Sequence, residues 1–150
     1  VYSVSANVPL GVHVGALPNG KKARQPLADG VAPVHGVELS GPTAVVKSVS
    51  KLNHEKITNG TILNQKFTPK VLEGERGKRG LANLIRSYFD LGGWHIQFNV
   101  VSADTLRAAQ KDPEKHKGLI IRVAGYSAFF VELDTAVQDD IIDRTEAETM

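Results

Sequence analysis

Gly125 stands between two apolar runs in the last third of the sequence, residues 119–123 before it and residues 128–131 after it. The runs have the composition of strands, whereas a glycine inside a strand pattern commonly marks a bulge or a turn. Glycine does so because, without a side chain, its backbone adopts torsions that other residues avoid. The pattern therefore predicts a strand over 119–123 that leads into a loop at Gly125.

Strand-like and helix-like segments alternate along the rest of the chain. The pattern predicts strands over 2–8, 61–67 and 94–101, and helices over 43–52, 79–91, 102–111 and 135–144. Residues 9–43 read as a long connection, because they are rich in Gly, Pro, Asn and Asp, which favour turns. This order is typical of a mixed α/β architecture. We do not expect these few strands to close a barrel alone.

The segment 79–91 has the clearest helical pattern. Its apolar side chains recur every three or four residues, which places them on one face of a helix. These side chains are Leu81, Leu84, Ile85, Tyr88 and Phe89. Gly92 and Gly93 follow directly and predict the end of the helix.

Capping residues and apolar stripes support the shorter helices. Pro42 suits the first turn of the helix at 43–52, Ser102 is a good N-cap for the helix that runs to about Lys111, and Pro113 ends that helix. The predicted inward-facing residues of the first and last helices are Val45, Val46, Val49, Val137, Ile141 and Ile142.

Composition narrows the class of protein. A chain of 150 residues has the size of one domain, and its 41% hydrophobic and 23% charged residues are typical of a globular protein. A formal net charge of +2 gives no indication of nucleic-acid binding. No apolar run approaches the length of a membrane span, and the start does not resemble a signal peptide. We therefore expect a cytoplasmic protein with neither a membrane nor a nucleic acid as partner.

Two features suggest that the sequence is part of a larger unit. It begins with Val1 rather than methionine, and the strand predicted over 2–8 needs a partner that only much later segments offer. It also contains no cysteine.

No metal site is predicted, because the histidines lack the spacing of metal ligands. They are His13, His35, His54, His95 and His116.

The stretch around Gly125 reads Arg-Val-x-Gly-Tyr-Ser-x-x-Phe over residues 122–130. It resembles the signature of the glycyl radical enzymes, the anaerobic family that includes pyruvate formate-lyase, glycerol dehydratase and choline trimethylamine-lyase. Further motifs follow in the order that the family has. They occupy residues 15–23, 26–30, 41–44, 48–52, 59–61, 97–101, 112–115 and 138–145. The resemblance therefore covers nearly the whole of 1–150.

The resemblance implies a fold and a chemistry. The chain would be the C-terminal glycine-radical domain of a catalytic subunit built as a ten-stranded β/α barrel, which we expect to be a homodimer. Gly125 would be the radical site. A radical S-adenosylmethionine activating enzyme with a [4Fe–4S] cluster would remove a hydrogen atom from it, and no cofactor would bind to this chain directly. A cysteine from outside the chain would carry the radical onward to a small-molecule substrate.

The motif also suggests which residues support the glycine. Arg122 would position the loop through hydrogen bonds, unless it is an ordinary arginine at a strand edge. Tyr126 would pack over the radical, although any buried tyrosine would look the same in sequence. Ser127 completes the predicted loop-positioning set, and the apolar runs at 119–123 and 128–131 are expected to shield the radical.

The residues around the glycine look closer to the dehydratase and lyase branch of the family than to pyruvate formate-lyase. That branch implies radical cleavage of a C–O, C–N, C–C or C–S bond. Three alternatives remain open. The chain could belong to a formate-lyase-type acyltransferase, act as a spare part that repairs oxygen-damaged formate-lyase, or be a non-catalytic scaffold that retains the motif.

Overall fold

The computed structural model describes residues 6–149 of the chain. The described residues form helices together with one three-stranded sheet and one two-stranded hairpin. In chain order the elements are α1 (Asn7–Gly11), α2 (Gly41–Val49), η1 (His54–Lys56), β1 (Asn64–Phe67), η2 (Pro69–Leu72), α3 (Gly74–Asp90), β2 (Gln97–Val100), α4 (Ala103–Lys111), η3 (Pro113–His116), β3 (Ile120–Arg122), β4 (Ser127–Phe129), η4 (Phe130–Glu132), α5 (Thr135–Asp143) and β5 (Glu146–Ala147). The mixed α/β class predicted from the sequence is confirmed.

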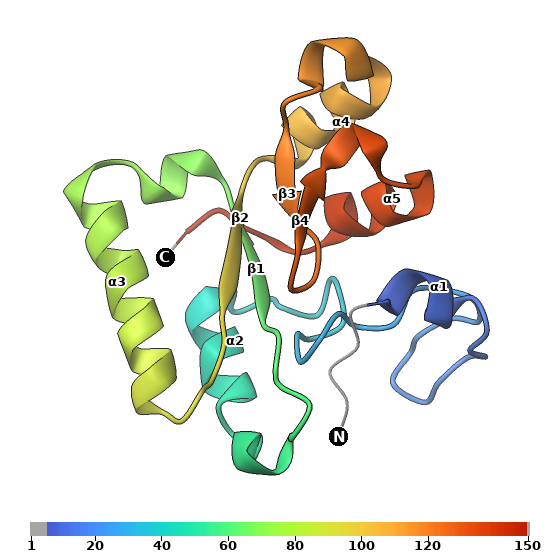
Figure 1. Cartoon of the computed structure of the whole chain (residues 1–150). Helices are drawn as coiled ribbons and strands as arrows, with labels where there is room; N and C mark the ends of the chain where they lie inside the picture. The colour runs from blue at the N-terminus through green and yellow to red at the C-terminus, as the bar shows by residue number, and fades with distance from the viewer. Residues whose placement is uncertain (1–5, 150) are drawn as a thin grey trace.

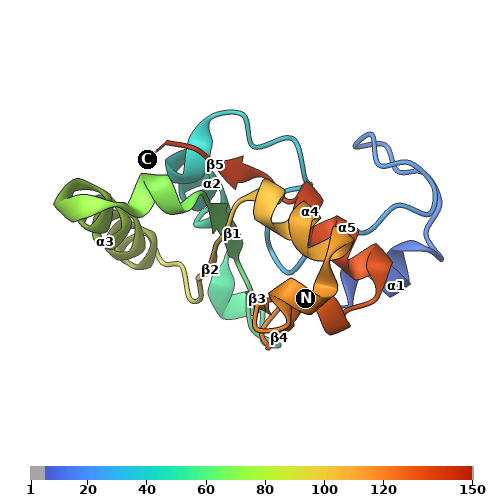
Figure 2. The ribbon, with the colours of Figure 1, turned by 90° about the horizontal axis from the view of Figure 1, so that it is seen from above.

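The three-stranded sheet is parallel and has the order β2-β1-β5. β1 and β2 pair along their full length, from Asn64 opposite Gln97 to Phe67 opposite Val100. The connection between them runs through α3, as a parallel pair requires. In Figures 1 and 2, α3 lies on one side of this strand pair, and α4 and α5 lie on the other.

The remaining strands, β3 and β4, form an antiparallel hairpin in which Arg122 pairs with Ser127. Figure 1 shows the hairpin beside α5, with its tip directed away from α4. Each strand has three residues, and Gly125 lies in the turn between them.

Two hydrophobic cores hold these elements together. The first lies under α2, β1 and α3, and its most buried members include Leu63, Phe67 and Tyr88. The second lies between the hairpin, α4 and α5, and includes Leu106 and Phe130. The hairpin therefore packs on a different core from the three-stranded sheet, and polar side chains cross between the two.

The clearest sequence signals produce the expected helices. α3 ends where Gly93 N–H donates to the Tyr88 carbonyl and Gly92 N–H donates to the Phe89 carbonyl, both at 2.9 Å. This is the Schellman arrangement, which Gly92 permits with its φ of +91°. The side chain of Ser102 caps α4 by accepting a hydrogen bond from the N–H of Thr105.

The predicted start of the chain requires a correction. Residues 2–5 of the strand predicted over 2–8 lie outside the described residues, and Asn7 and Val8 begin helix α1 instead of continuing a strand. The alternating side chains suggested a strand, but Pro9 suits the first turn of a helix. The side chain of Asn7 also donates to the carbonyl of Leu27 and to Oδ1 of Asp140, which fixes this turn against the loop and α5.

Several predicted boundaries are also wrong. α2 covers 41–49 rather than 43–52, and α3 starts at Gly74 rather than at Arg79. The strands predicted over 61–67 and 94–101 are reduced to 64–67 and 97–100. Trp94 and Phe89, expected inside, are exposed.

The described range, 6–149, contains no helix that is both long and apolar enough to cross a membrane.

Candidate functional site

Gly125 lies at the tip of the β3–β4 hairpin. Its φ of +79° is in the left-handed region, which L side chains rarely adopt. The turn brings Val123 N–H to 2.8 Å from the carbonyl of Tyr126. Gly125 is exposed, whereas Val123 and Ala124 directly before it are buried. The residues that lead into the turn are therefore buried, with Val123 in the second core, whereas the glycine lies at the surface of the described chain.

A side chain at this position would meet a second constraint. A β-carbon built on Gly125 would lie 3.1 Å from Cδ1 of Ile62, which is closer than ordinary van der Waals contact. The backbone torsion and this neighbour both favour glycine.

The apolar cover predicted around Gly125 is present on one face of the hairpin only. Ile121 is buried, whereas Ile120 and Phe129 are exposed. Tyr126, which the motif suggested as cover for the glycine, is 49% exposed in this chain. Successive residues of a strand point to opposite faces, so one face of this short hairpin packs on the core and the other stays open.

Arg122 connects the two strands of the hairpin to β2. Its Nη1 donates to Oγ of Ser127 at 3.3 Å, and its Nη2 donates to Oε1 of Gln97 at 2.8 Å. The structure thus brings Arg122 and Ser127 together, and it adds Gln97 as a partner that the motif did not indicate.

Asn99 makes a second connection from β2. Its Oδ1 accepts from the backbone N–H of Arg122 at 2.9 Å, and its Nδ2 donates to the backbone carbonyl of Arg122 at 2.8 Å.

The carbonyl of Val123 is held from two directions. Nη1 of Arg144 donates to it at 2.7 Å, and Nδ2 of Asn64 donates to it at 3.3 Å. Arg144 follows α5, while Asn64 begins β1, so elements from both cores meet at this one oxygen.

A chain of buried polar groups continues from these residues. Arg144 Nη2 lies 3.2 Å from Oδ2 of Asp140, and Asp140 also faces Nδ1 of His35 at 3.7 Å. Nε2 of His35 lies 3.3 Å from Oδ1 of Asp29. The amide of Asn64 donates to the other oxygen of Asp29, which closes the network back to β1.

The charges in this network shift the ionisation of its members. Burial raises the pKa of Asp29, but the hydrogen bond from His35 and the positive charge of Arg144 outweigh burial and leave that pKa below its ordinary value. Burial lowers the pKa of His35, but the hydrogen bond to Asp29 and the negative charge of Asp140 outweigh it and leave the pKa raised. Asp29 and His35 therefore favour an ion pair.

The network contains residues to which the sequence reading gave no role at the glycine, namely Asp29, Asn64, Gln97, Asn99, Asp140 and Arg144. One signal was available. Asn64, Gln97 and Asn99 are polar residues inside predicted strands, and buried polar side chains need hydrogen-bond partners.

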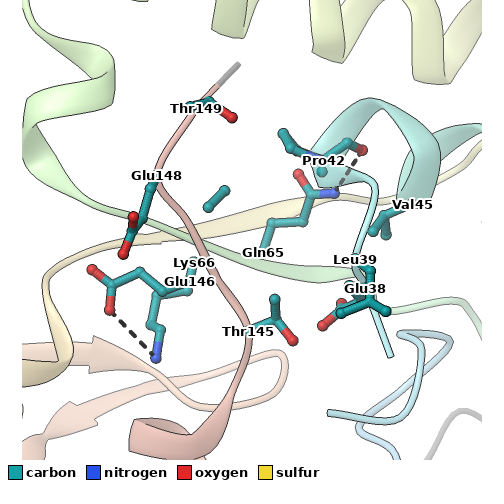
Figure 3. A pocket seen from close by; sticks show the side chains of 12 residues that line it. Glu38, Leu39, Pro42, Val45, Gln65, Lys66, Thr145, Glu146, Glu148 and Thr149 are labelled. Atoms are coloured by element: carbon teal, nitrogen blue, oxygen red, sulfur yellow. Dashed lines mark hydrogen bonds and ion pairs between the residues drawn. The ribbon is translucent and has the colours of Figure 1, made fainter. Parts of the chain in front are cut away.

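A cavity of ≈ 250 Å³ lies between α2, β1 and residues 145–149. Figure 3 shows Gln65 directed toward Pro42, and Lys66, the next residue of β1, directed toward Glu146. Burial raises the pKa of Glu38, which also lines the cavity, and lowers the pKa of Lys66. The hairpin residues are not part of its lining, so this cavity is separate from the Gly125 site.

In the part of the chain that the structure describes, no three His, Cys, Asp or Glu side chains are placed to hold a metal ion together.

The sequence profile of the family described as "Glycine radical" matches residues 27–131. The match includes the hairpin with Gly125. It also includes β1 and β2, whose side chains form hydrogen bonds to the hairpin.

Individual relatives match almost the whole chain. It is 51% identical over 145 residues to a probable dehydratase of Escherichia coli (strain K12), covering 96% of this chain and 18% of the relative. It is 49% identical over 148 residues to the isethionate sulfite-lyase of Oleidesulfovibrio alaskensis, covering 97% of this chain and 18% of the relative. Its structure is similar, with a TM-score of 0.93 and 56% identity, to the glycerol-bound B12-independent glycerol dehydratase from Clostridium butyricum, covering 96% of this chain and 18% of that one. The chain therefore spans about 18% of the length of these proteins.

Proposed function

The chain belongs to the glycine radical family, and we propose that it stores an unpaired electron on the α carbon of Gly125 for an enzyme of the dehydratase or lyase type. The family resemblance drawn from the sequence is thereby confirmed. The observation that carries the proposal is the position of the glycine. Gly125 stands at the tip of a hairpin, with a φ of +79° and with Cδ1 of Ile62 3.1 Å from where a β-carbon would lie.

The chemistry explains why this residue should be glycine. An unpaired electron on an α carbon is delocalised onto the adjacent amide nitrogen and carbonyl group, which requires a planar carbon. Without a side chain, glycine can flatten at low steric cost. At Gly125 a β-carbon would also be in tight contact with Cδ1 of Ile62.

The rest of the reaction requires groups from outside this chain. The sequence contains no cysteine, so the thiol that exchanges a hydrogen atom with the glycine must come from another part of the enzyme. We propose that this part is a ten-stranded β/α barrel to which the present chain adds its C-terminal segment, in a homodimeric enzyme. A radical S-adenosylmethionine activating enzyme with a [4Fe–4S] cluster would generate the radical.

The relatives support the class of reaction. A probable dehydratase, a sulfite-lyase and a glycerol dehydratase are all about half identical to this chain. We therefore propose radical elimination from a small hydroxylated or related substrate, with cleavage of a C–O, C–N, C–C or C–S bond, in the cytoplasm. A formate-lyase-type acyltransferase or its spare-part subunit is the second candidate.

The residues around the glycine have supporting roles in this proposal. Arg122 and Ser127 would fix the relative position of the two hairpin strands, because they form a side-chain hydrogen bond across them. Tyr126, which is exposed here, would pack over the glycine only when the rest of the enzyme covers the hairpin.

The test exposes the complete, anaerobically activated enzyme to air and locates backbone cleavage by mass spectrometry. Dioxygen adds to a carbon-centred radical, so we expect cleavage at Gly125, none in Gly125→Ala, and normal cleavage in Gly118→Ala. Gly118 is a suitable control because a β-carbon there would have no neighbour within 4 Å. Activity that is retained in Gly125→Ala, without cleavage in any variant, would favour the scaffold interpretation.

A further inference from the structure

One edge of β3 pairs with β4, and its other edge is open. Val123 N–H donates to the carbonyl of Tyr126, and Phe130 N–H donates to the carbonyl of Leu119, both at 2.8 Å. The backbone N–H and C=O groups of the odd-numbered residues of this strand therefore point toward β4. In an antiparallel pair the backbone groups of the residues between them point the other way, so the N–H and C=O of Arg122 lie on the open edge.

Asn99 of β2 fills that edge with its side chain. The amide accepts from the N–H of Arg122 at 2.9 Å and donates to its carbonyl at 2.8 Å. One buried side chain thus pairs both backbone groups of one residue, as a neighbouring strand would. The amide of Asn99 carries both the donor and the acceptor that this arrangement needs.

The turn after β3 also depends on side chains from elsewhere. A two-residue hairpin is usually closed by a hydrogen bond to the carbonyl at the start of the turn from the N–H at its end. In the described chain, the Val123 carbonyl instead accepts from Arg144 at 2.7 Å and from Asn64 at 3.3 Å. The turn is therefore held both by the bond from Val123 N–H to the Tyr126 carbonyl within the hairpin and by side chains from outside it.

We propose that Asn64, Asn99 and Arg144 form a clamp that sets the position of Gly125, and that they are positioning residues for the radical reaction. Asn99 acts through Arg122, while Asn64 and Arg144 act through Val123. The inference rests on the proposed function, because these residues can position Gly125 for reaction only if Gly125 exchanges a hydrogen atom.

The geometry of that exchange explains why a clamp is needed. As the S–H bond of the cysteine thiol breaks, a C–H bond forms on the α carbon of Gly125, and the unpaired electron moves to sulfur. Such a step needs the reacting atoms about 3–3.5 Å apart, and a shift of about 1 Å can slow a reaction about 100-fold. A hairpin with strands this short is marginal by itself, so its tip needs support from other elements.

Asn99 offers the sharpest variants. Asn99→Asp keeps the acceptor for the N–H of Arg122 but loses the donor to its carbonyl, whereas Asn99→Leu loses both. Asn83→Asp is the matched control, because Asn83 is exposed on α3. Arg144→Lys keeps a positive charge beside Asp140 but loses the second donor group, and it tests the other half of the clamp.

The experiment uses the complete enzyme after activation. Electron paramagnetic resonance counts the radicals, and steady-state kinetics gives kcat per radical and KM. We expect kcat per radical to fall at least about tenfold in both Asn99 variants and in Arg144→Lys, with KM within about twofold, because these side chains bond the backbone of the hairpin. Asn83→Asp should match the unmodified enzyme. If Asn99→Leu does not fold, Asn99→Asp and Arg144→Lys decide the matter.

Two results would overturn the clamp. The first is kcat per radical within about twofold of the unmodified enzyme in Asn99→Asp and Arg144→Lys. The second is a fall in kcat per radical that is matched by an equal fall in the fraction of folded protein, which is what a merely structural role predicts. Absence of any radical in the unmodified enzyme would instead refute the proposed function, and the clamp with it.

Discussion

At Gly125 an alanine would meet two obstacles, the left-handed backbone and the methyl group of Ile62. The left-handed conformation costs an L residue about 1–2 kcal/mol. We therefore predict that Gly125→Ala lowers the free energy of unfolding of the chain by about 1–2 kcal/mol, measured by urea denaturation. Gly118→Ala, at an open position, should change it by less than about 0.5 kcal/mol. Equal effects in the two variants would contradict the account of the turn.

The ion pair between Asp29 and His35 predicts how stability depends on pH. The pKa of His35 is raised above its ordinary value of 6.5, so its contribution is complete below pH 6.5 and is lost as the pH rises through the raised value. The pKa of Asp29 is lowered below its ordinary value of 3.8, so its contribution is present above pH 3.8 and is lost as the pH falls through the lowered value. The pair therefore stabilises most between these two ordinary values.

Thermal unfolding at a series of pH values checks this prediction. The unmodified chain should lose stability above pH 6.5 as His35 loses its proton, and His35→Gln should remove that part of the loss. The control is His13→Gln, at an exposed position. Identical pH profiles for the unmodified chain and His35→Gln would show that the pair does not stabilise the fold.

The turn at Gly125 was predictable from the sequence, but most of the contacts that hold the hairpin were not. Gly125, Arg122 and Ser127 are neighbours along the chain, so a local motif could group them. The contact between Asn64 and Val123 joins residues 59 positions apart, and no local spacing predicts such a pair. Tyr126 was expected to be buried, but its 49% exposure depends on what covers the hairpin, which its sequence neighbours do not reveal.

Among the elements, α4 carries a simple test of local capping. Oγ of Ser102 accepts from the N–H of Thr105 at 3.1 Å, an N–H that the helix leaves without a backbone partner. Ser102→Ala should lower the free energy of unfolding by about 1 kcal/mol, measured by urea denaturation. Ser87→Ala, at an exposed position inside α3, should not. A cost for Ser87→Ala as large as that for Ser102→Ala would contradict this role.

The ends of helices were predicted best where a single local sequence signal determines them. Ser102 and the Gly92-Gly93 pair placed helix ends correctly. The start of α3 was missed because Gly74, Gly77 and Gly80 weaken the helical pattern. Packing overrides that weakness, since a β-carbon on Gly77 would lie 2.6 Å from the backbone of Leu72. The glycine there serves a close contact with η2 that propensity alone does not indicate.

At the scale of the whole molecule, Lys66 joins the two cores. It lies on β1, is 2% exposed, and donates from Nζ to the carbonyl of Ile142 at 2.7 Å, at the end of α5. A cation at a helix C-terminus is favourable, and an unpaired buried carbonyl is costly. Lys66→Met should therefore lower the free energy of unfolding by about 1–3 kcal/mol. Lys78→Met, at an exposed site on α3, should leave it within about 0.5 kcal/mol. Equal midpoints in urea for these two variants would contradict the bridging role.

The alternation of helices and strands predicted the class of the fold but not the division into two cores. Each core combines residues from distant parts of the chain, such as Val101 and Ile142 in the second core. Helix periodicity identifies the buried face of each element without identifying the element that covers it. The assembly of the hairpin with α4 and α5, apart from the three-stranded sheet, required the structure.

The most direct test of the central claim is electron paramagnetic resonance of the complete, activated enzyme under strict anaerobiosis. A carbon radical on glycine keeps one α hydrogen, so the account predicts a doublet that collapses to a single line when the protein is made with α-deuterated glycine. The doublet should be absent in Gly125→Ala and present in Gly118→Ala. No signal in a folded and fully partnered enzyme, or a doublet that survives in Gly125→Ala, would contradict the assignment of the radical to Gly125.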